Sequence, residues 1–289
     1  IDGVLLREEY SSGSVLLTLT DKENLDKYAV GDSIVQSGES SALVDAFSTT
    51  LYTGNEVDNR QIETGIDNTG KSLVWIKNRS QVQEHFLSGD ILEGKYLSSN
   101  LTDGLSGSAY DFFKSFDENG VTISNAGQVN KSGSSQVLWN FRALPQFFDI
   151  QTYVGTGDDQ GQPHNLSSVP GCMILKVTGS STDWYVYHKE LGTGSYLQLN
   201  ISNPTGTQAT SFPITPTQSL FYPGALLSAS GYEYVAYLFA DTPGLIKCGS
   251  YSYVTTGQTV NCGFEPEFLL VKNTQRTENW LIFDNKRVV

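Results

Sequence analysis

The stretch Gly133-Ser-Ser-Gln-Val-Leu-Trp-Asn-Phe141 decides the fold, because it returns 98 residues later as Gly231-Tyr-Glu-Tyr-Val-Ala-Tyr-Leu-Phe239. In both copies a glycine turn precedes a run of large apolar and aromatic residues, which is typical of a buried β-strand. Pro145 and Pro243 follow the two copies at the same spacing. Self-similarity at a fixed period indicates an architecture built from repeated units.

A second motif extends this similarity to three copies. Each copy is an apolar run that ends in lysine, and eight residues after the lysine stands a large ring side chain. The runs are Leu73-Val-Trp-Ile-Lys77, Cys172-Met-Ile-Leu-Lys176 and Phe268-Leu-Leu-Val-Lys272, and the ring residues are His85, Trp184 and Trp280. The first copy therefore departs from the other two, since it has histidine in place of tryptophan.

These matches divide the chain into four parts. Residues 1–45 form an N-terminal β segment, 46–144 a first unit, 145–242 a second unit, and 243–289 the start of a third, incomplete unit. Half a unit cannot bury its own apolar face. We therefore expect either that the natural chain continues or that residues 248–289 pack on the preceding unit. The polar N-terminal segment should dock on the first unit or on a neighbouring chain.

The fold class follows from the pattern inside each unit. Short runs alternate apolar and polar residues, and Gly, Ser, Thr and Asn interrupt them about every ten residues, which favours antiparallel sandwiches over βαβ units. Runs that are apolar at every position, such as 73–76 and 268–271, predict central strands buried on both faces. We predict an all-β protein of tandem antiparallel β-sandwich repeats, jelly-roll or lectin-like, of about 98 residues each.

Composition and charge exclude several classes of partner. The net charge is −13 and no Lys/Arg stripe is visible, which argues against a nucleic-acid partner. No apolar run approaches the roughly 18 residues of a membrane helix, so we expect no membrane insertion. The three cysteines, Cys172, Cys248 and Cys262, are too few for a disulfide scaffold. Buried free thiols are the main interpretation, and a Cys248–Cys262 bridge is the alternative.

The sequence offers no catalytic, metal-binding or cofactor-binding motif. His85, His164 and His188 do not have the spacing of metal ligands, and no nucleophile elbow or phosphate-binding loop is present. No pair of carboxylates stands out from the 31 acidic residues, most of which lie in turn-like stretches. We therefore expect no enzyme activity, no catalytic residues, no bound metal and no cofactor.

Aromatic residues provide the only candidate binding site. The run Trp184-Tyr-Val-Tyr187-His188 places rings on both faces of an expected strand, and Trp280 is the counterpart of Trp184. Sugar-binding proteins stack aromatic planes on sugars, and interfaces enrich Tyr and Trp, while core packing accounts for about half of such rings. The candidates for a glycan site are Trp184, Tyr185, Tyr187, His188 and Trp280.

The strand motifs also resemble a family. Their pattern is similar to the repeated β domain of virion structural proteins of tailed bacteriophages, including cyanophages, which are often tail-fibre or tail-associated components. The resemblance covers about residues 47–289. The segments that carry it are Leu73–Arg79, Tyr96–Asn100, Phe116–Gly120, Val137–Arg142, Val169–Lys176, Asp183–His188 and Val235–Phe239.

The resemblance implies a structural role in the phage particle, in a tail or surface appendage. It implies contacts with other virion proteins, a homotrimer, and attachment to a host surface glycan. Few charges and tandem β units fit such an extended particle protein. Two alternatives are a capsid decoration or head-fibre protein and a carbohydrate-binding or depolymerising module. The resemblance provides no catalytic residues to carry over.

Overall fold

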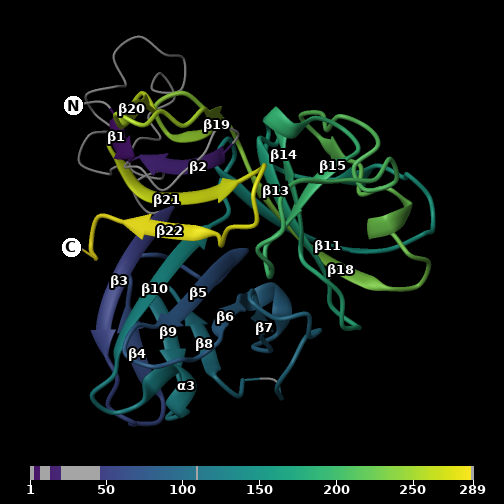
Figure 1. Cartoon of the computed structure of the whole chain (residues 1–289). Coiled ribbons are helices and arrows are strands. Elements are labelled where there is room, and N and C mark those ends of the chain that lie inside the picture. The colour runs from purple at the N-terminus through teal and green to yellow at the C-terminus, as the bar shows by residue number, and fades with distance from the viewer. Residues whose placement is uncertain (1–2, 7–13, 21–45, 109, 288–289) are drawn as a thin grey trace.

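The computed structural model describes residues 3–6, 14–20, 46–108 and 110–287, and almost all of its regular structure is β. The prediction of an all-β fold made of antiparallel sheets is confirmed. Three larger sheets converge on a common core, and smaller sheets cover their outer sides (Figure 1). The helical segments are single turns: η3 (Asp90–Leu92), α3 (Gly127–Asn130), η4 (Lys189–Leu191) and η5 (Ala225–Leu227).

The first unit is a two-layer sandwich. Its large sheet has the order β3-β10-β5-β6-β7, and a small sheet has the order β4-β9-β8. The bounds are β3 (Phe47–Thr53), β4 (Arg60–Glu63), β5 (Ser72–Asn78), β6 (His85–Ser88), β7 (Leu97–Ser98), β8 (Phe113–Asp117), β9 (Gly120–Ile123) and β10 (Ser135–Arg142).

Strand β5 shows why the apolar runs have no polar alternation. Val74 and Ile76 point to the core that the small sheet covers, whereas Leu73 and Trp75 point to the core shared by all three units. Both faces of the strand are therefore buried, as the sequence predicted for runs of this kind.

The second unit has the same strand order. Its large sheet is β11-β18-β13-β14-β15-β16, and β12 pairs with β17 beside it. The bounds are β11 (Phe148–Val154), β12 (Gln162–Pro163), β13 (Cys172–Val177), β14 (Tyr185–His188), β15 (Ser195–Gln198), β16 (Gly206–Thr207), β17 (Leu220–Phe221) and β18 (Glu233–Phe239). Strands β11, β18, β13, β14 and β15 thus take the places of β3, β10, β5, β6 and β7.

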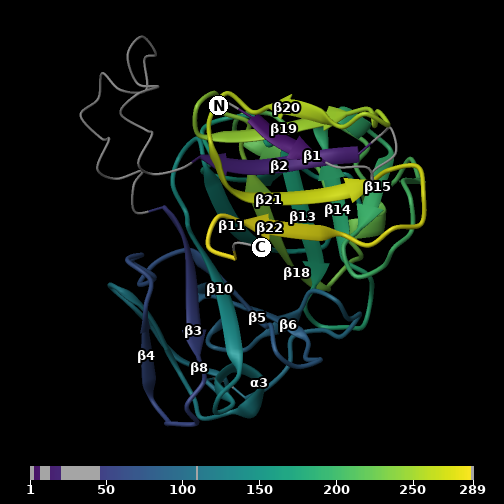
Figure 2. The same ribbon diagram turned by 60° about the vertical axis from the view of Figure 1, so that its left-hand side comes forward.

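The third sheet is assembled from both ends of the chain. Its order is β19-β2-β21-β22, and β1 pairs with β20 (Figure 2). The bounds are β1 (Gly3–Leu6), β2 (Ser14–Thr20), β19 (Ile246–Tyr251), β20 (Gln258–Asn261), β21 (Pro266–Asn273) and β22 (Leu281–Asp284). Strand β2 occupies the position that β10 and β18 hold in the other units.

This arrangement corrects the expectation for the N-terminal segment. Strand β2 pairs with β19 and β21, so it does not dock on the first unit or need a neighbouring chain. Residues 248–289 contact the preceding unit, which is the second of the two alternatives expected for them. They form a sheet with the N-terminal strand, and they contact the second unit as well through Trp280.

The inner faces of the three large sheets meet in one hydrophobic core. Phe141 lies at its centre, with ring centroids 5.7 Å from those of Phe148, Phe239 and Phe268. These rings come from β10, β11, β18 and β21, so all three units contribute to the cluster. Phe47 of β3 completes it at 4.9 Å from Phe141.

The closure of the third sheet by β2 can be tested with proline at its centre. Leu17 pairs with Cys248 on one side and with Leu270 on the other. Leu17→Pro removes a backbone donor inside a central strand and should cost about 3 kcal/mol or more. Hydrogen exchange should show lost protection in β19 and β21, with β10 and β18 still protected. Leu17→Val, which keeps the amide, is the control, and equal protection in both variants would contradict the closure.

Candidate functional site

The structure does not bring the predicted aromatic residues together on one surface. Trp184, Tyr187 and His188 are 0%, 3% and 1% exposed, so the expectation of accessible rings is wrong for these three. Tyr187 packs against Phe212, and Nδ1 of His188 accepts a hydrogen bond from the backbone N–H of Glu190. All three side chains therefore pack in the core or stabilise a turn.

Tyr185 is half-buried and lies in a groove on the second unit. The groove has a volume of about 300 Å³, and Tyr232, whose residue is 47% exposed, also lines it. Asp183 is at the same groove, but its two carboxylate oxygens already accept hydrogen bonds from Gln198 and Asn200. We name this site, lined by Tyr185, Tyr232 and Asp183, the tyrosine groove.

Trp184 is buried because it joins two units. Its indole Nε1 donates to the carbonyl oxygen of Ser98, at 3.1 Å, and to that of Leu101, at 3.2 Å. Both acceptors belong to the first unit. Trp280 of the third unit makes the corresponding bond to the carbonyl oxygen of Gln198 in the second unit, at 2.7 Å. The repeated tryptophan therefore attaches each unit to the one before it.

The repeated lysines act in the same way. Lys176 is 1% exposed, and its Nζ donates to three carbonyl oxygens, of which Thr102 O lies in the first unit at 3.1 Å. Lys272 is 0% exposed and has three carbonyl acceptors as well, including Ser202 O of the second unit at 3.1 Å. Burial lowers the pKa of both ammonium groups to about 8.

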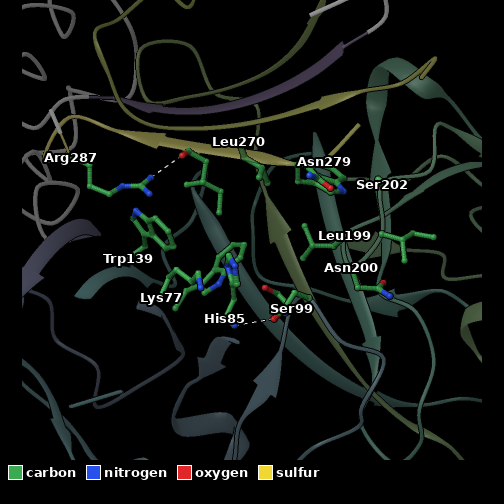
Figure 3. A pocket seen from close by; sticks show the side chains of 15 residues that line it. Lys77, His85, Ser99, Trp139, Leu199, Asn200, Ser202, Leu270, Asn279 and Arg287 are labelled. Atoms are coloured by element: carbon green, nitrogen blue, oxygen red, sulfur yellow. Dashed lines mark hydrogen bonds between the residues drawn. The ribbon is translucent and has the colours of Figure 1, made fainter. Parts of the chain in front are cut away.

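Trp280 also lines a cavity between the first and third units. It has a volume of about 630 Å³, and residues 199–202 of the second unit reach its edge (Figure 3). We name it the junction pocket. Its principal side chains are Trp75, Lys77, His85, Trp139, Trp280 and Arg287.

One wall of the junction pocket is an aromatic and ionic cluster. Arg287 lies over the ring of Trp139, at 4.9 Å from the centroid, and donates through Nε to Asp284. Trp139 donates through Nε1 to the same carboxylate, at 2.9 Å. These contacts attach the end of the third unit to β10 of the first.

The opposite wall holds Lys77 and His85. Burial, together with the positive charges of Lys77 and Arg287, lowers the pKa of His85 to about 4. The pKa of Lys77 is also lowered, mainly by burial. At neutral pH the imidazole is therefore neutral, and the Arg287 guanidinium is paired with Asp284.

The described residues contain no group of three or more His, Cys, Asp or Glu side chains that could hold a metal ion. Cys172, Cys248 and Cys262 are free and buried, so the interpretation as buried thiols is confirmed and the Cys248–Cys262 bridge does not form. No helix among the described residues has the length and apolar character needed to cross a bilayer.

Comparison with known protein families matches residues 43–289 to a domain of unknown function, DUF7483. The chain belongs to this family. A search of curated proteins and a search of solved structures each found no match. The family match covers the first two units and the C-terminal strands of the third, but not β1 or β2.

Sequence reasoning identified Trp280 and missed the residues beside it. The sequence assigned the other residues of the pocket to core strands or to the chain end, because a pocket between units produces no pattern in the local sequence. These residues are Trp75, Lys77, Trp139 and Arg287. The signal that could have found the pocket was the triplet of lysines, Lys77, Lys176 and Lys272, each followed by a ring eight residues later. A lysine at the end of a buried strand needs acceptors, and a neighbouring unit can supply them.

Replacement of Trp184 tests whether this side chain joins the first and second units or binds a ligand. Trp184→Ala should lower the free energy of unfolding by about 3–5 kcal/mol, because it removes a fully buried aromatic side chain. Urea unfolding followed by circular dichroism measures this. The matched control is Tyr232→Ala, an exposed aromatic on the same unit, which should change stability by under about 0.5 kcal/mol. A Trp184 variant as stable as the control would refute the joint.

His85 should make the junction sensitive to acid. Its pKa is about 4 in the folded state, below the ordinary 6.5, so the unfolded chain binds more protons between these pH values. Stability is unaffected above pH 6.5 and falls as the pH drops toward 4. Between pH 7 and 4.5, the free energy of unfolding should fall in both proteins. With allowance for the partial exposure of His85, we expect this fall to be about 1–2 kcal/mol smaller in His85→Gln than in the parent protein. Parallel urea titrations measure the difference, and identical losses would contradict it.

Proposed function

We propose that the protein is a structural component of a bacteriophage virion, most naturally of the tail or its fibres, and that it has no enzyme activity. The resemblance of the strand motifs to repeated domains of phage tail proteins supports this proposal. The observation that carries it is the joining of units. The buried side chains of Trp184, Lys176 and Lys272 and the half-buried Trp280 all donate to backbone carbonyls of the preceding unit. Side chains at the contacts between units make the chain rigid, and they are not placed to act on a substrate.

The same joints suit a load-bearing particle protein. Three units share one core, so a force on one unit is transmitted to the others through packed side chains instead of a flexible linker. Under this proposal the chain assembles as a homotrimer with other virion proteins in a tail or surface appendage. It binds neither nucleic acid nor a membrane.

Host attachment through a glycan has a specific candidate site, the tyrosine groove. Tyr185 and Tyr232 provide ring surface there, and Asp183 and Thr182 provide polar groups. Of the residues that the sequence suggested for a glycan, Tyr185 and Trp280 alone are partly accessible, and they line different cavities. A capsid decoration or head-fibre protein, or a carbohydrate-binding or depolymerising module, is the alternative to a tail protein.

Location on the particle tests the proposal. Immunogold electron microscopy of purified virions from the phage that encodes this chain should label the tail or its fibres. Native mass spectrometry of the isolated protein should give a trimer. Label on the capsid lattice would favour a decoration protein. Release of reducing sugar from host polysaccharide would favour a depolymerase, and unlabelled particles would overturn the virion assignment.

A further inference from the structure

Two segments of the chain cross from one unit to the next. They are residues 96–102, Tyr-Leu-Ser-Ser-Asn-Leu-Thr, and residues 196–202, Tyr-Leu-Gln-Leu-Asn-Ile-Ser. We name them the crossing segments. They share the pattern Tyr-Leu-Xaa-Xaa-Asn-Leu/Ile-Ser/Thr, and Tyr-Leu-Xaa-Xaa-Asn occurs at these two places in the sequence. Each begins as a strand of its own sheet, β7 or β15, and ends on the following unit.

The first half of each crossing segment adds a strand to its own sheet. Leu97 and Ser98 pair with Leu87 and Phe86 of β6. In the second unit, Leu197 and Gln198 pair with Val186 and Tyr185 of β14. The leucine at the second position is 0% exposed in both copies, which explains why the pattern requires it.

The asparagine of the pattern then closes the turn. Oδ1 of Asn100 accepts from the backbone N–H of His85 at 2.9 Å, and Oδ1 of Asn200 accepts from that of Trp184, also at 2.9 Å. Nδ2 of each asparagine donates to the acidic residue just before, Glu84 or Asp183. The asparagine therefore fixes the crossing segment to the start of β6 or β14.

The last residue of the pattern reaches the following unit. The carbonyl oxygen of Thr102 accepts from Lys176 Nζ and from the backbone N–H of Thr182, at 2.9 Å. The carbonyl oxygen of Ser202 accepts in the same way from Lys272 Nζ and from the backbone N–H of Glu278, at 2.9 Å. The two interfaces thus share these two bonds to the carbonyl oxygen of the last residue.

A third such site exists between the third and first units, and the described residues leave it without a crossing segment. Strand β22 corresponds to β6 and β14, and within the described part of the chain it pairs with β21 alone. The backbone N–H of Trp280 stands where those of His85 and Trp184 meet their asparagines. No described residue accepts from it.

On the first unit, the receiving side of this third site is also incomplete. Lys77 corresponds to Lys176 and Lys272, yet its Nζ has one described acceptor, Gln83 O at 2.6 Å, where each of the others has three. The backbone N–H of Gln83, the counterpart of those of Thr182 and Glu278, has no described acceptor. Lys77 of the first unit and Ile282 of β22 both line the junction pocket, which Figure 3 shows.

We propose that the junction pocket and the edge of β22 bind an extended polypeptide segment of the pattern Tyr-Leu-Xaa-Xaa-Asn-Leu/Ile-Ser/Thr, which displaces Arg287 from the carbonyl oxygen of Ile282. Its leucine pairs opposite Ile282 and its third residue opposite Leu281. Its asparagine accepts from the backbone N–H of Trp280, and the carbonyl of its last residue accepts from Lys77. Strand addition supplies backbone hydrogen bonds, and these side-chain contacts supply specificity.

The chemistry of the site favours a peptide over a sugar or an anion. The groups at the site are backbone donors and acceptors along the edge of β22 and the ammonium group of Lys77, which can donate to a carbonyl oxygen. One of these acceptors, the carbonyl oxygen of Ile282, now accepts from Arg287 Nη2 at 2.8 Å, and an added strand would take the place of that bond. Two segments within the same chain already fill the equivalent sites. The inference does not depend on the virion proposal, because it rests on the internal correspondence of the three sites.

The experiment uses the full chain and a synthetic copy of residues 196–202 with capped ends, titrated by calorimetry and by tryptophan fluorescence. We expect saturable one-to-one binding, with new hydrogen-exchange protection at residues 281–284 and at Gln83. Asn200→Ala in the peptide should weaken binding about tenfold, since it removes the bond from the backbone N–H of Trp280. Lys77→Met in the protein should also weaken it, whereas Lys131→Met, at an exposed lysine of the same unit, should not.

A tethered version ensures that weak binding does not escape detection. The same seven residues are attached after Val289 through a short Gly/Ser linker, which raises their effective concentration to the millimolar range. Protection of β22 in this fusion, and its loss with Asn200→Ala in the attached copy, supports the site. Absence of protection in both the free and tethered forms overturns the proposal. Hydrogen-exchange protection that appears elsewhere in the chain also overturns the proposal. So does displacement of a labelled peptide by oligosaccharides when the unlabelled peptide does not displace it.

Discussion

Burial of each large sheet on both faces is the constraint on which this structure depends. A central strand such as β5 has one face against its own small sheet and the other against the shared core, so no unit can bury its inner face alone. Each buried Phe or Trp contributes about 2–3 kcal/mol through removal from water. The rings of Phe141, Phe148, Phe239 and Phe268 meet only when three units are present, and this requirement explains why the N-terminal strand β2 completes the third sheet.

The hydrophobic core brings the units together, but it does not fix how one unit is aligned with the next. The buried lysines provide that alignment, because an ammonium group removed from water must find several acceptors at defined positions. Lys176 and Lys272 find theirs at a carbonyl of the preceding unit and at carbonyls of their own loop. A shift of one residue would leave the charge unpaired at a cost of several kcal/mol, so these contacts give specificity more than stability.

Sequence reasoning found the strands and the correspondences, because both depend on local patterns. The runs that end in Phe141 and Phe239 and those that end in the lysines were recognised from side-chain type and spacing. Pairing across the chain could not be predicted in the same way, and β2 therefore had no identified partner. Trp184 was a candidate for a glycan site because its run places rings on both faces of a strand, and alternation turns only one set of rings inward. In the folded protein the preceding unit covers the face that carries Trp184, which no pattern around residue 184 records.

The histidine at position 85 follows from the same physics. An indole buried at this position needs an acceptor for its N–H, and Trp184 and Trp280 obtain one from the carbonyls of Ser98 and Gln198. Around His85 the described residues supply no corresponding carbonyl, so a tryptophan there would hold a donor in a half-buried pocket without a protein partner. An imidazole is smaller and offers both a donor and an acceptor, so water or a polypeptide carbonyl can satisfy it. Histidine thus takes the place of tryptophan at one of the three junctions. It is the junction for which the described residues provide no crossing segment.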